Sequence, residues 1–439
     1  MGRFAKRSMG TLLASGMRFG VELAHSILIA RFLGPEGKGI YSLAVLVPSL
    51  LTTLGNLGIS PATTYLLGRG RHKANYIFST LTGLSLVISV VGLGVGCTLV
   101  LSAGTSFLRG VPVEYSLIAL LVFPFRLLLR YSRSVQLGLQ RFGRYNMLVI
   151  LRPILLLVLT VLIVVVLRMG TLGALAATVA AGLCGAIVSF QQAKRQSEPV
   201  EWIWNKQYAR EALVYGVKAH IGNVAGYLNY RIDIFLVGAL ANPLSVGYYS
   251  IAVAIAERLW LISQAASTVL FPRVAAEQDE KRLRDFTPLV VRNTLLMSML
   301  SACILLLLSR WLLTFLYSDA FLKSVRPLQL LLPGIIALSG ARVLANDIAG
   351  RGFPQLNSYV GAMGVAVNVG LNLLWIPRWG IAGAALASTV SYTAILIMRT
   401  WLYCRISGNS AWKTLVVRRE DFGLYVRLAK SLLRKTRGS

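Results

Sequence analysis

Apolar runs of about twenty residues recur along this chain of 439 residues. Clear examples are TLTGLSLVISVVGLGVGCTLVLS (80–102), ILRPILLLVLTVLIVVVLR (150–168) and LLMSMLSACILLLLSRWLLTFLY (295–317). A helix of this length matches the ~30 Å hydrocarbon core of a bilayer. Hydrophobic residues make up 56% of the chain and charged residues only 14%, which is too little polar material to cover a soluble protein of this size. The pattern predicts an all-α polytopic membrane protein.

Dividing the chain at its polar connections gives about twelve expected spans. They run over 8–32, 40–67, 75–102, 113–137, 145–168, 171–192, 209–239, 245–271, 289–317, 322–349, 357–377 and 380–403. The basic N-terminus resembles the start of a signal peptide. The apolar segment that follows continues to about Phe32, however, and contains Arg18, Glu22 and His25. We therefore expect a first spanning helix and not a cleaved leader.

The net charge of +29 could suggest a nucleic-acid partner. Most of the Lys and Arg residues, however, lie at the N-terminus, in the connections after even-numbered spans and in the C-terminal tail. By the positive-inside rule, this distribution places both termini in the cytoplasm. The basic excess therefore reflects topology, and we expect no nucleic-acid partner.

The four cysteines stand singly in or beside apolar segments, at Cys97, Cys184, Cys303 and Cys404. No CxxC or Cys/His spacing typical of metal sites occurs, and no disulfide pairing is indicated. We expect small core residues at these positions, with no metal and no bound cofactor.

The chain also repeats itself. ARFLGPEGKGIYSLAV (30–45) aligns at an offset of 208 with GALANPLSVGYYSIAV (238–253), through identities that include Pro35/Pro243 and Gly39/Gly247. GTLGALAA (170–177) matches GIAGAALA (380–387) at an offset of 210, in the same order. With six spans in each repeat, both repeats enter the membrane in the same orientation. This predicts two pseudo-symmetric six-helix bundles with a substrate site between them.

The expected domains follow from this repeat. They are an N-terminal six-helix bundle (1–193), a cytoplasmic linker (194–208), a C-terminal six-helix bundle (209–404) and a basic cytoplasmic tail (405–439). Within the tail, DFGLYVRLAKSLLRK (421–435) has apolar residues on one helical face and cations opposite. It is either an amphipathic helix on the anionic inner leaflet or a frayed solubilising tail.

Ionisable residues lie inside the expected spans, where each Arg, Lys or Asp near a span centre costs ~2.5–3.5 kcal/mol. We expect these residues to line a water-accessible, mainly cationic cleft between the bundles, or else to pin helices together. Cations outnumber anions, so the candidate ligand is anionic. The candidate substrate-binding residues are Arg18, Arg126, Arg152, Lys218, Arg231, Arg258 and Arg342, and the candidate coupling or charge-partner residues are Glu22, His25, Asp233, Glu257 and Asp347.

Arg231 and Asp233 are two residues apart, so they cannot neutralise each other within one helix. We expect one of them to pair with Glu257 or Arg258 of the next span and the other to remain available to a ligand. At the offset of 208, Asp233 aligns with His25. Glu22 and His25 lie one turn apart and are candidates to carry a coupling proton or cation.

Two long segments resemble a known family. IARFLGPEGKGIYSLAVLVPSLLTTLGNLGISPATTYLLGR (29–69) resembles the opening of polysaccharide exporters of the oligosaccharide-flippase type. YRIDIFLVGALANPLSVGYYSIAVAIAERLWLISQAASTVLFPRVA (230–275) is similar to the seventh and eighth helices of that family, including the positions of Asp233 and Glu257. The family shares its superfamily with MATE drug exporters and lipid II flippases, so the resemblance implies a MATE/flippase-like fold.

The resemblance also implies a bacterial inner-membrane protein that moves a polyprenyl-diphosphate-linked oligosaccharide to the outer leaflet by alternating access. The product would be O-antigen, capsule or exopolysaccharide, and a polymerase and glycosyltransferases of the same pathway would be partners. By position, Arg18, Arg231 and Arg258 would contact the diphosphate or sugars, whereas Asp233 and Glu257 would be charge partners or coupling groups. A proton or sodium gradient would be the source of energy.

Two other functions remain open at this stage. A MATE-like cation-coupled drug antiporter has the same architecture but is expected to need an acid-rich lobe. A membrane polymerase or glycosyltransferase is expected to need a large external loop, whereas the outer connections here are short, as in RFLGPEGKG (31–39), and no DxD or HExxH motif stands in a suitable context. A lipid II flippase usually carries two further helices. We therefore expect a transporter and not an enzyme.

Overall fold

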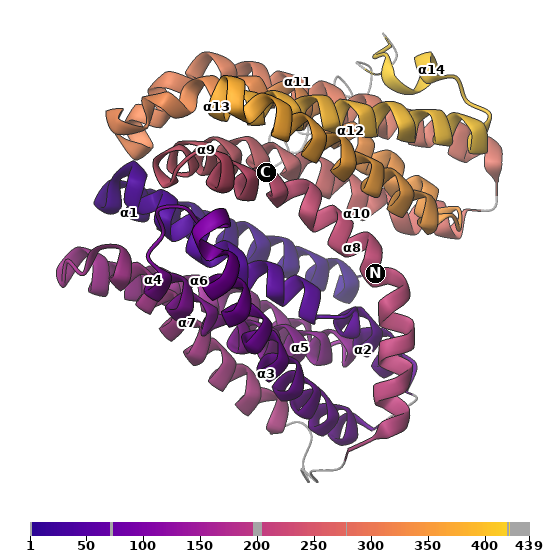
Figure 1. Cartoon of the computed structure of the whole chain (residues 1–439). Coiled ribbons are helices and arrows are strands. Elements are labelled where there is room, and N and C mark those ends of the chain that lie inside the picture. Colours follow the sequence, from indigo (N-terminus) through magenta and orange to yellow (C-terminus); the bar gives the residue numbers. More distant parts are fainter. Residues whose placement is uncertain (1, 71–72, 196–203, 278, 419–420, 422–439) are drawn as a thin grey trace, which may run out of the picture. The chain divides into compact units, whose positions relative to one another are not determined.

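The computed structural model describes residues 2–70, 73–195, 204–277, 279–418 and 421, and within these it is built from helices (Figure 1). In the first half they are α1 (Gly2–Gly55), α2 (Ile59–Gly68), α3 (Ala74–Phe107), α4 (Val113–Leu120), α5 (Val122–Gly138), α6 (Phe142–Thr160), the π-helical η1 (Val161–Val166) and α7 (Gly170–Lys194). In the second half they are α8 (Lys206–Leu240), α9 (Pro243–Ala256), the 3-10 turn η2 (Glu257–Leu259), α10 (Trp260–Ala276), α11 (Glu280–Tyr317), η3 (Asp319–Ser324), α12 (Val325–Gly350), α13 (Pro354–Ser407) and α14 (Ala411–Leu415).

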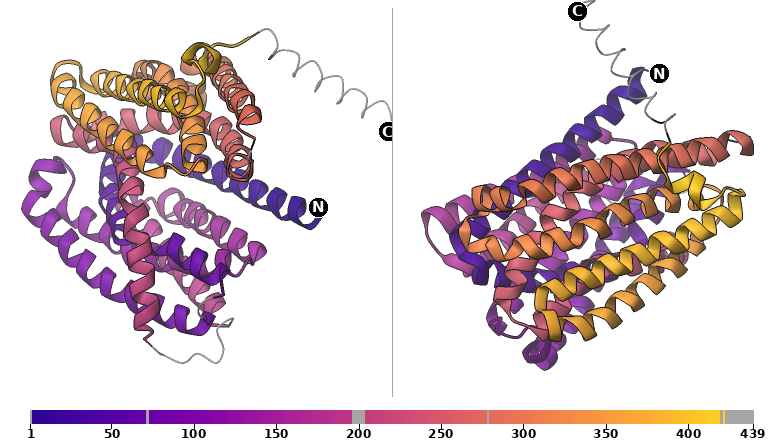
Figure 2. Two further views of the ribbon diagram at one scale, coloured as in Figure 1. Left: turned by 90° about the vertical axis from the view of Figure 1, so that its right-hand side faces the viewer. Right: turned by 90° about the horizontal axis from the view of Figure 1, so that it is seen from above.

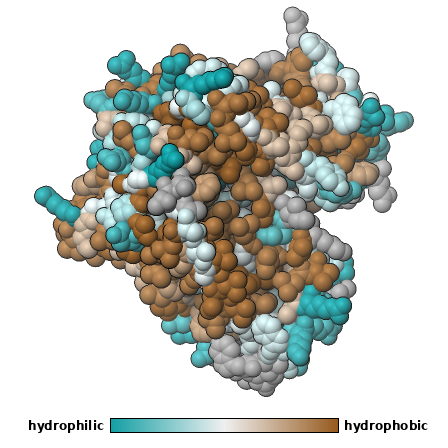
Figure 3. All heavy atoms as spheres, viewed as in Figure 1, coloured by the Kyte–Doolittle hydropathy of each residue, from teal (hydrophilic) through white to brown (hydrophobic). Residues whose placement is uncertain are grey.

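Among the described residues, seven helical stretches are long and apolar enough to cross a membrane. They cover nine of the twelve expected spans completely or in part, because α1 and α13 are double-length helices of 54 residues each. The expected spans outside this set fall in α4–α5, α8 and α9–α10, the helices that carry Arg126, Arg231, Asp233 and Glu257. Hydrophobic residues cover much of the face seen in Figure 3. The expectation of an all-α polytopic membrane protein is confirmed.

Glycines break the two double-length helices where the sequence places boundaries between spans. Gly34 has φ 66° and ψ −177° within α1, and Gly380 has φ 56° and ψ −136° within α13. Gly170, which the repeat alignment pairs with Gly380, also has φ 56°. A positive φ costs glycine little because it has no Cβ. The two aligned glycines therefore share a positive φ angle as well as a sequence context.

The expected span 40–67 is interrupted by a turn with positive φ angles and does not form a single helix. The chain breaks after Gly55, with Leu57 at φ 46° and Gly58 at φ 71°, before α2 begins at Ile59. A Cβ at Gly58 would lie 2.1 Å from the carbonyl oxygen of Gly216 in α8. The break lets two backbones approach closely, and hydropathy alone cannot reveal such a contact.

By their internal contacts the residues form two compact units. Unit 1 comprises 1–227, 234–250 and 314–321, whereas unit 2 comprises 228–233, 251–313 and 322–439. The two six-helix bundles and the linker expected from the sequence stay predictions, and linker residues 196–203 lie outside the described part of the chain.

Unit 1 is held together by close packing of small residues. α6 packs against α1 and α7, and α5 packs against α7, α3 and α2. Leu156 on α6 meets Ala177 and Ala181 on α7 in one buried cluster. Within a bilayer, small residues allow helices to approach closely enough for extensive van der Waals contact.

In unit 2, α11, α12 and α13 run side by side (Figure 2). α10 packs on α12, and a core cluster joins Leu270 and Val274 of α10 with Val291 of α11, Leu344 of α12 and Tyr403 of α13. This core leaves the mid-helix polar residues of unit 2, described below, on a rigid support.

The repeat-related segments touch each other within unit 1. A Cβ at Gly39 would lie 1.7 Å from the carbonyl oxygen of Pro243, and a Cβ at Gly247 would lie 1.8 Å from that of Pro35. Beside them, the Ser42 and Ser250 hydroxyls are 3.5 Å apart. Equivalent residues of the two repeats therefore meet reciprocally, as they would about a pseudo-two-fold axis.

We expect Gly39→Ala to destabilise the protein by about 1–3 kcal/mol, because the added methyl group forces apart two backbones in contact. The midpoint of thermal unfolding in detergent measures the effect. Gly20→Ala is the matched control, since a Cβ there meets nothing within 4 Å. Equal midpoints for the two variants would contradict the close backbone contact.

The start of the tail folds back onto α11. Arg292 forms a bidentate ion pair with Asp421, at 2.6 and 2.7 Å, and also donates to the carbonyl oxygen of Lys413 at 2.6 Å. Lys413 pairs with Asp285 of α11 at 2.7 Å. Apart from Asp421, the amphipathic helix expected at 421–435 lies outside the described residues.

Docking of the tail should depend on pH. The hydrogen bond from Arg292 lowers the pKa of the Asp421 carboxyl below its ordinary value of about 3.9. A depressed carboxyl pKa contributes stability that is present above the unfolded pKa and lost as pH falls through the folded one. We therefore expect the tail to stay docked at pH 5–7 and to loosen only below about pH 4.

The mobility of a spin label at Ala411→Cys, with the four native cysteines replaced, measures this docking. Arg292→Gln should give a mobile label already at pH 7. A label equally mobile in the parent and in Arg292→Gln at pH 7 would refute the role of the ion pair.

Candidate functional site

The clearest ionic contact among the candidate residues joins Arg231 of α8 to Glu257 of η2. Arg231 Nη1 lies 2.7 Å from Glu257 Oε1, and Nη2 lies 3.1 Å from Oε2. The side chains are 32% and 17% exposed, so solvent screens the attraction between the two charges only in part. The expected pairing of Arg231 with the next span is confirmed, with Glu257 as the partner. Arg258 follows in the same turn, half-buried.

Asp233 begins a buried polar chain through unit 2. Its carboxylate accepts a hydrogen bond from the Ser388 hydroxyl at 3.2 Å, and Asn368 donates to Ser388 at 3.3 Å. Asn372, one turn further along α13, donates to the Asn368 side-chain oxygen at 2.8 Å. All four side chains are at most 1% exposed. A carboxylate, a hydroxyl and two amide oxygens form a donor set suited to a hard cation or a proton.

Asp347 is engaged in a separate contact near the end of α12. The Thr287 hydroxyl donates to its carboxylate at 2.5 Å, and Arg351 forms an ion pair with it. Arg351 also pairs with Glu280 at the start of α11, at 2.7 Å. Asp347 therefore has a charge partner of its own, in a cluster that joins α11 to α12.

Unit 1 carries the arginines of α5 and α6. Arg126 Nη1 donates to the Ser49 hydroxyl at 2.5 Å, and Arg133 donates to the Leu148 carbonyl. The Nε atoms of Arg126, Arg133 and Arg152 are buried without a hydrogen-bond partner in the described part of the chain. No ion pair involves Arg126 or Arg152 there either, so both cations are available to an anion.

The remaining candidates of unit 1 lie on α1 and α8. Arg18 and Glu22 form an exposed i,i+4 pair at 3.8 Å. His25 is buried, with its ring centroid 6.0 Å from that of Tyr41. Lys218 belongs to α8, but its side chain lies outside what the structure describes. The cleft expected between the bundles stays a prediction, as does the equivalence in height of His25 and Asp233.

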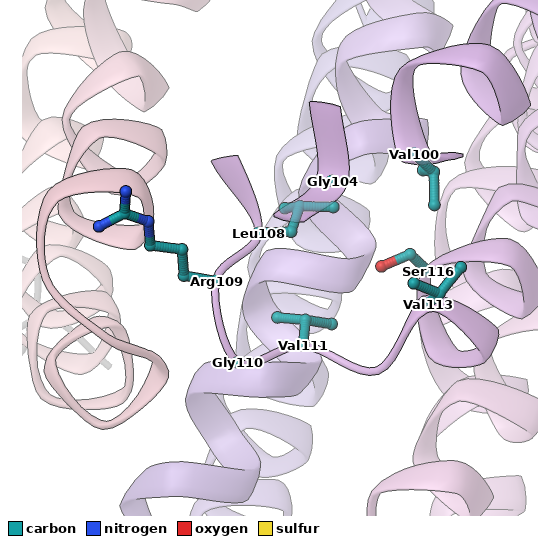
Figure 4. A pocket seen from close by; sticks show the side chains of 8 residues that line it. All are labelled: Val100, Gly104, Leu108, Arg109, Gly110, Val111, Val113 and Ser116. Carbon is teal, nitrogen blue, oxygen red and sulfur yellow. The ribbon is translucent and has the colours of Figure 1, made fainter. Parts of the chain in front are cut away.

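A cavity in unit 1 lies where α3 turns into α4, with a volume of about 380 Å³. Val100, Val111, Val113 and Ser116 are among its lining residues, and Figure 4 shows Arg109 extending away from them. With a single ionisable side chain that points elsewhere, this cavity offers no polar chemistry for a charged ligand.

The sequence interpretation missed several polar residues of unit 2. Asn368 and Asn372 stand at i,i+4 spacing within an apolar span, and two amides at that spacing were a readable signal. Arg399 lies four residues before the end of the expected span 380–403 and is not among the candidate residues. Ser388 and Trp260 gave no signal, because single hydroxyls and aromatics are common in membrane helices.

The comparisons with known proteins agree with this architecture. Residues 28–326 match the family described as "Polysaccharide biosynthesis protein". The match covers more than half of the chain, and the chain belongs to this family.

Two distant relatives of the chain match it over most of their length. One is the "Probable low-salt glycan biosynthesis flippase Agl15" of Haloferax volcanii, 22% identical over 90% of this chain and 82% of the relative. A "Putative O-antigen transporter" of Shigella flexneri is 21% identical over 86% of this chain and 92% of its own length. Among solved structures, the lipid II flippase MurJ in an inward closed conformation matches with a TM-score of 0.76, at 16% identity and 96% coverage of both chains. The flippase-like fold expected from the sequence is confirmed.

Proposed function

We propose that the chain is a flippase that moves a lipid-linked oligosaccharide, carried on a polyprenyl diphosphate, from the cytoplasmic to the outer leaflet. The saccharide serves the assembly of a surface polysaccharide. The observation that carries this proposal is membership of the polysaccharide biosynthesis family over residues 28–326. The two relatives named as a glycan flippase and an O-antigen transporter support the same substrate class.

The charges of the described residues suit such a substrate. A diphosphate presents several anionic oxygens, and guanidinium groups bind phosphate oxygens in a bidentate manner. Arg126 and Arg152 of unit 1 have no carboxylate partner among the described residues, and Arg342 of unit 2 lies over aromatic rings and not beside an acid. In the proposed cycle, arginines of this kind hold the diphosphate while the polyprenyl chain stays in the bilayer.

Transport would be coupled to a proton or sodium gradient through Asp233. This carboxylate is 1% exposed and joins Ser388, Asn368 and Asn372, which together can receive a small cation. Glu22 is less suited to this role than the sequence suggested, because it lies exposed beside Arg18.

The proposal places the protein in a bacterial cytoplasmic membrane with both termini in the cytoplasm. The tail described above contains the basic residues Lys413 and Arg418, and basic residues close to a membrane span suit an anionic inner leaflet. A polymerase and glycosyltransferases of the same pathway are the proposed partners. The chain itself transports its substrate and catalyses no covalent step.

The decisive experiment reconstitutes the full chain in liposomes with a fluorescent polyprenyl-diphosphate-linked oligosaccharide. We expect the inner-leaflet probe to become accessible to a membrane-impermeant quencher at a rate far above that of empty liposomes. A fluorescent phospholipid is the control and should stay in its leaflet. A rate no different from that of protein-free liposomes would refute the proposal.

The same liposomes discriminate the alternatives. A cation-coupled drug antiporter would move cationic dyes against a gradient and would lose this activity in Glu22→Gln. An enzyme would convert the lipid-linked oligosaccharide in detergent solution, where a flippase leaves it chemically unchanged. We expect neither dye transport nor a new product.

A further inference from the structure

A polar cavity of about 430 Å³ lies wholly within unit 2, a volume in the range of ligand pockets. Its walls come from four helices, α8, α10, α12 and α13. The polar residues that line it are Tyr230, Gln264, Ser267, Thr268, Arg342, Asn346 and Arg399. The cavity thus carries two guanidinium groups, two amides and three hydroxyls, and no carboxylate is among the residues that line it.

Arg342 is held in place by aromatic rings. Its guanidinium carbon lies 3.9 Å from the Trp260 ring centroid and 5.0 Å from that of Tyr230. The two rings are themselves in contact, with centroids 5.0 Å apart. Stacking on ring faces fixes the plane of a guanidinium and leaves its edge N–H groups free to donate. In the described part of the chain, no ion pair neutralises Arg342.

Arg399 enters the same cavity from α13. Its Nη1 donates to the Ala341 carbonyl oxygen at 3.1 Å, and its Nε is buried without a hydrogen-bond partner among the described residues. A buried N–H without an acceptor is unfavourable, and more so on a charged group. An anion in the cavity would supply that acceptor.

The neighbouring charges do not neutralise the cavity. Arg231 and Glu257 lie close by, but they satisfy each other in a bidentate pair. Arg342 and Arg399 therefore share one small space as uncompensated like charges, which disfavours the empty cavity and favours a bound anion. Two guanidinium groups and several neutral hydrogen-bond donors surround this cavity. Such a set of groups is suited to bind an oxyanion that carries more than one negative charge.

The position along the helices indicates the level in the membrane. Arg342 and Asn346 lie in the last third of α12, and Arg399 lies eight residues before the end of α13 at Ser407, about 12 Å along the helix axis. Both helices end on the side that the positive-inside rule assigns to the cytoplasm. The cavity is then close to the headgroup level of the inner leaflet, where a lipid-linked diphosphate begins its transfer.

We infer that this cavity, with Arg342 and Arg399 as its two cations, is the site where unit 2 binds the diphosphate of the lipid-linked substrate on the cytoplasmic side. The inference rests on the proposed function and adds a defined pocket, with Arg399, Gln264 and Asn346 as contacts. Trp260 and Tyr230 are positioning residues that orient Arg342.

Binding of polyprenyl diphosphate to the full chain in neutral phosphatidylcholine nanodiscs tests this inference. Arg399→Gln and Arg342→Gln should each weaken binding tenfold or more, and polyprenol without phosphate should bind poorly to every variant. Arg405→Gln is the matched control, because Arg405 lies on the same helix over a tryptophan ring, 4.7 Å from the Trp401 centroid, and does not line the cavity. It should bind within twofold of the parent.

Asn346→Asp guards against misfolding of the arginine variants. It keeps both cations and adds a carboxylate beside them, so it too should weaken binding tenfold or more. Inorganic diphosphate should compete with polyprenyl diphosphate in the parent, whereas phosphatidylglycerol at the same concentration should not. Unchanged binding in all three pocket variants would overturn the inference, and so would displacement by phosphatidylglycerol alone, which would assign the cavity to a membrane phospholipid.

Failure of the inference and failure of the proposed function give different results. If the parent flips the oligosaccharide but Arg399→Gln, Arg342→Gln and Asn346→Asp bind polyprenyl diphosphate as the parent does, the pocket assignment fails and the flippase stands. If the parent binds through these arginines but does not flip the oligosaccharide, the pocket stands and the flippase fails.

Discussion

Replacing Glu257 with Gln is expected to reduce oligosaccharide flipping at least tenfold. The substitution removes the carboxylate that holds Arg231 by two hydrogen bonds. A hydrogen bond to a charged group contributes about 1.5–3 kcal/mol, and the partly buried guanidinium would lose the counter-charge that Glu257 supplies. Arg231 would then move away from η2, and the turn that begins α10 would lose its tie to α8. The initial rate of quenching in the liposome assay measures the loss.

A charge swap provides the strongest test of this pair. Arg231→Glu combined with Glu257→Arg should restore much of the rate that either single variant loses. Asp279→Asn is the matched control, because the Asp279–Arg282 pair has side chains 47% and 73% exposed, and such surface pairs contribute little. Full activity in Glu257→Gln would show that the pair is dispensable.

Asp233→Asn is expected to abolish the dependence of flipping on an ion gradient and to lower the gradient-driven rate at least tenfold. Asn has nearly the same volume and can still accept the hydrogen bond from Ser388. The fold should therefore persist, while the one charge of the buried chain through Ser388 and Asn368 is lost. Flipping should be measured under an imposed sodium gradient and, separately, under an imposed proton gradient.

Asp347→Asn provides the comparison for this prediction. Asp347 is as deeply buried as Asp233 but lies outside the polar chain of Ser388 and Asn368, in a cluster with Arg351 and Glu280. The same substitution there should lower thermal stability and leave the response to the gradient intact. A parent protein that flips equally well with and without both gradients would refute coupling through Asp233.

The fold was largely predictable from the sequence because the bilayer imposes a strong length requirement on each span. Each of the twelve expected segments lies in helical structure, and the breaks at Gly34 and Gly380 fall at expected boundaries. The break after Gly55 was not predictable. It depends on the close approach of Gly58 to Gly216 of α8, about 160 residues away along the chain, and no local pattern encodes that contact.

The contacts of the site could be predicted from the sequence only where a buried charged residue has a single oppositely charged residue close enough to pair with it. Arg231 had to find an anion in a neighbouring span, and Glu257 was the acid expected there. Arg399 was overlooked because a position near a span end allows an arginine to extend to the headgroups, whereas the fold turns it into a cavity beside Arg342. Asn368, Asn372 and Ser388 are neutral. The free-energy cost of placing a charge within the membrane identifies charged residues as candidates, but it does not apply to these three.

The meeting of Gly39 with Pro243, and of Gly247 with Pro35, has a consequence for motion. Neither glycine has a side chain, so at these points bare peptide groups of one repeat rest on those of the other. Side chains that interlock lose rotamer freedom each time they engage, whereas peptide groups already fixed in a helix lose almost none. A contact of this kind can part and reseal repeatedly with little entropic penalty.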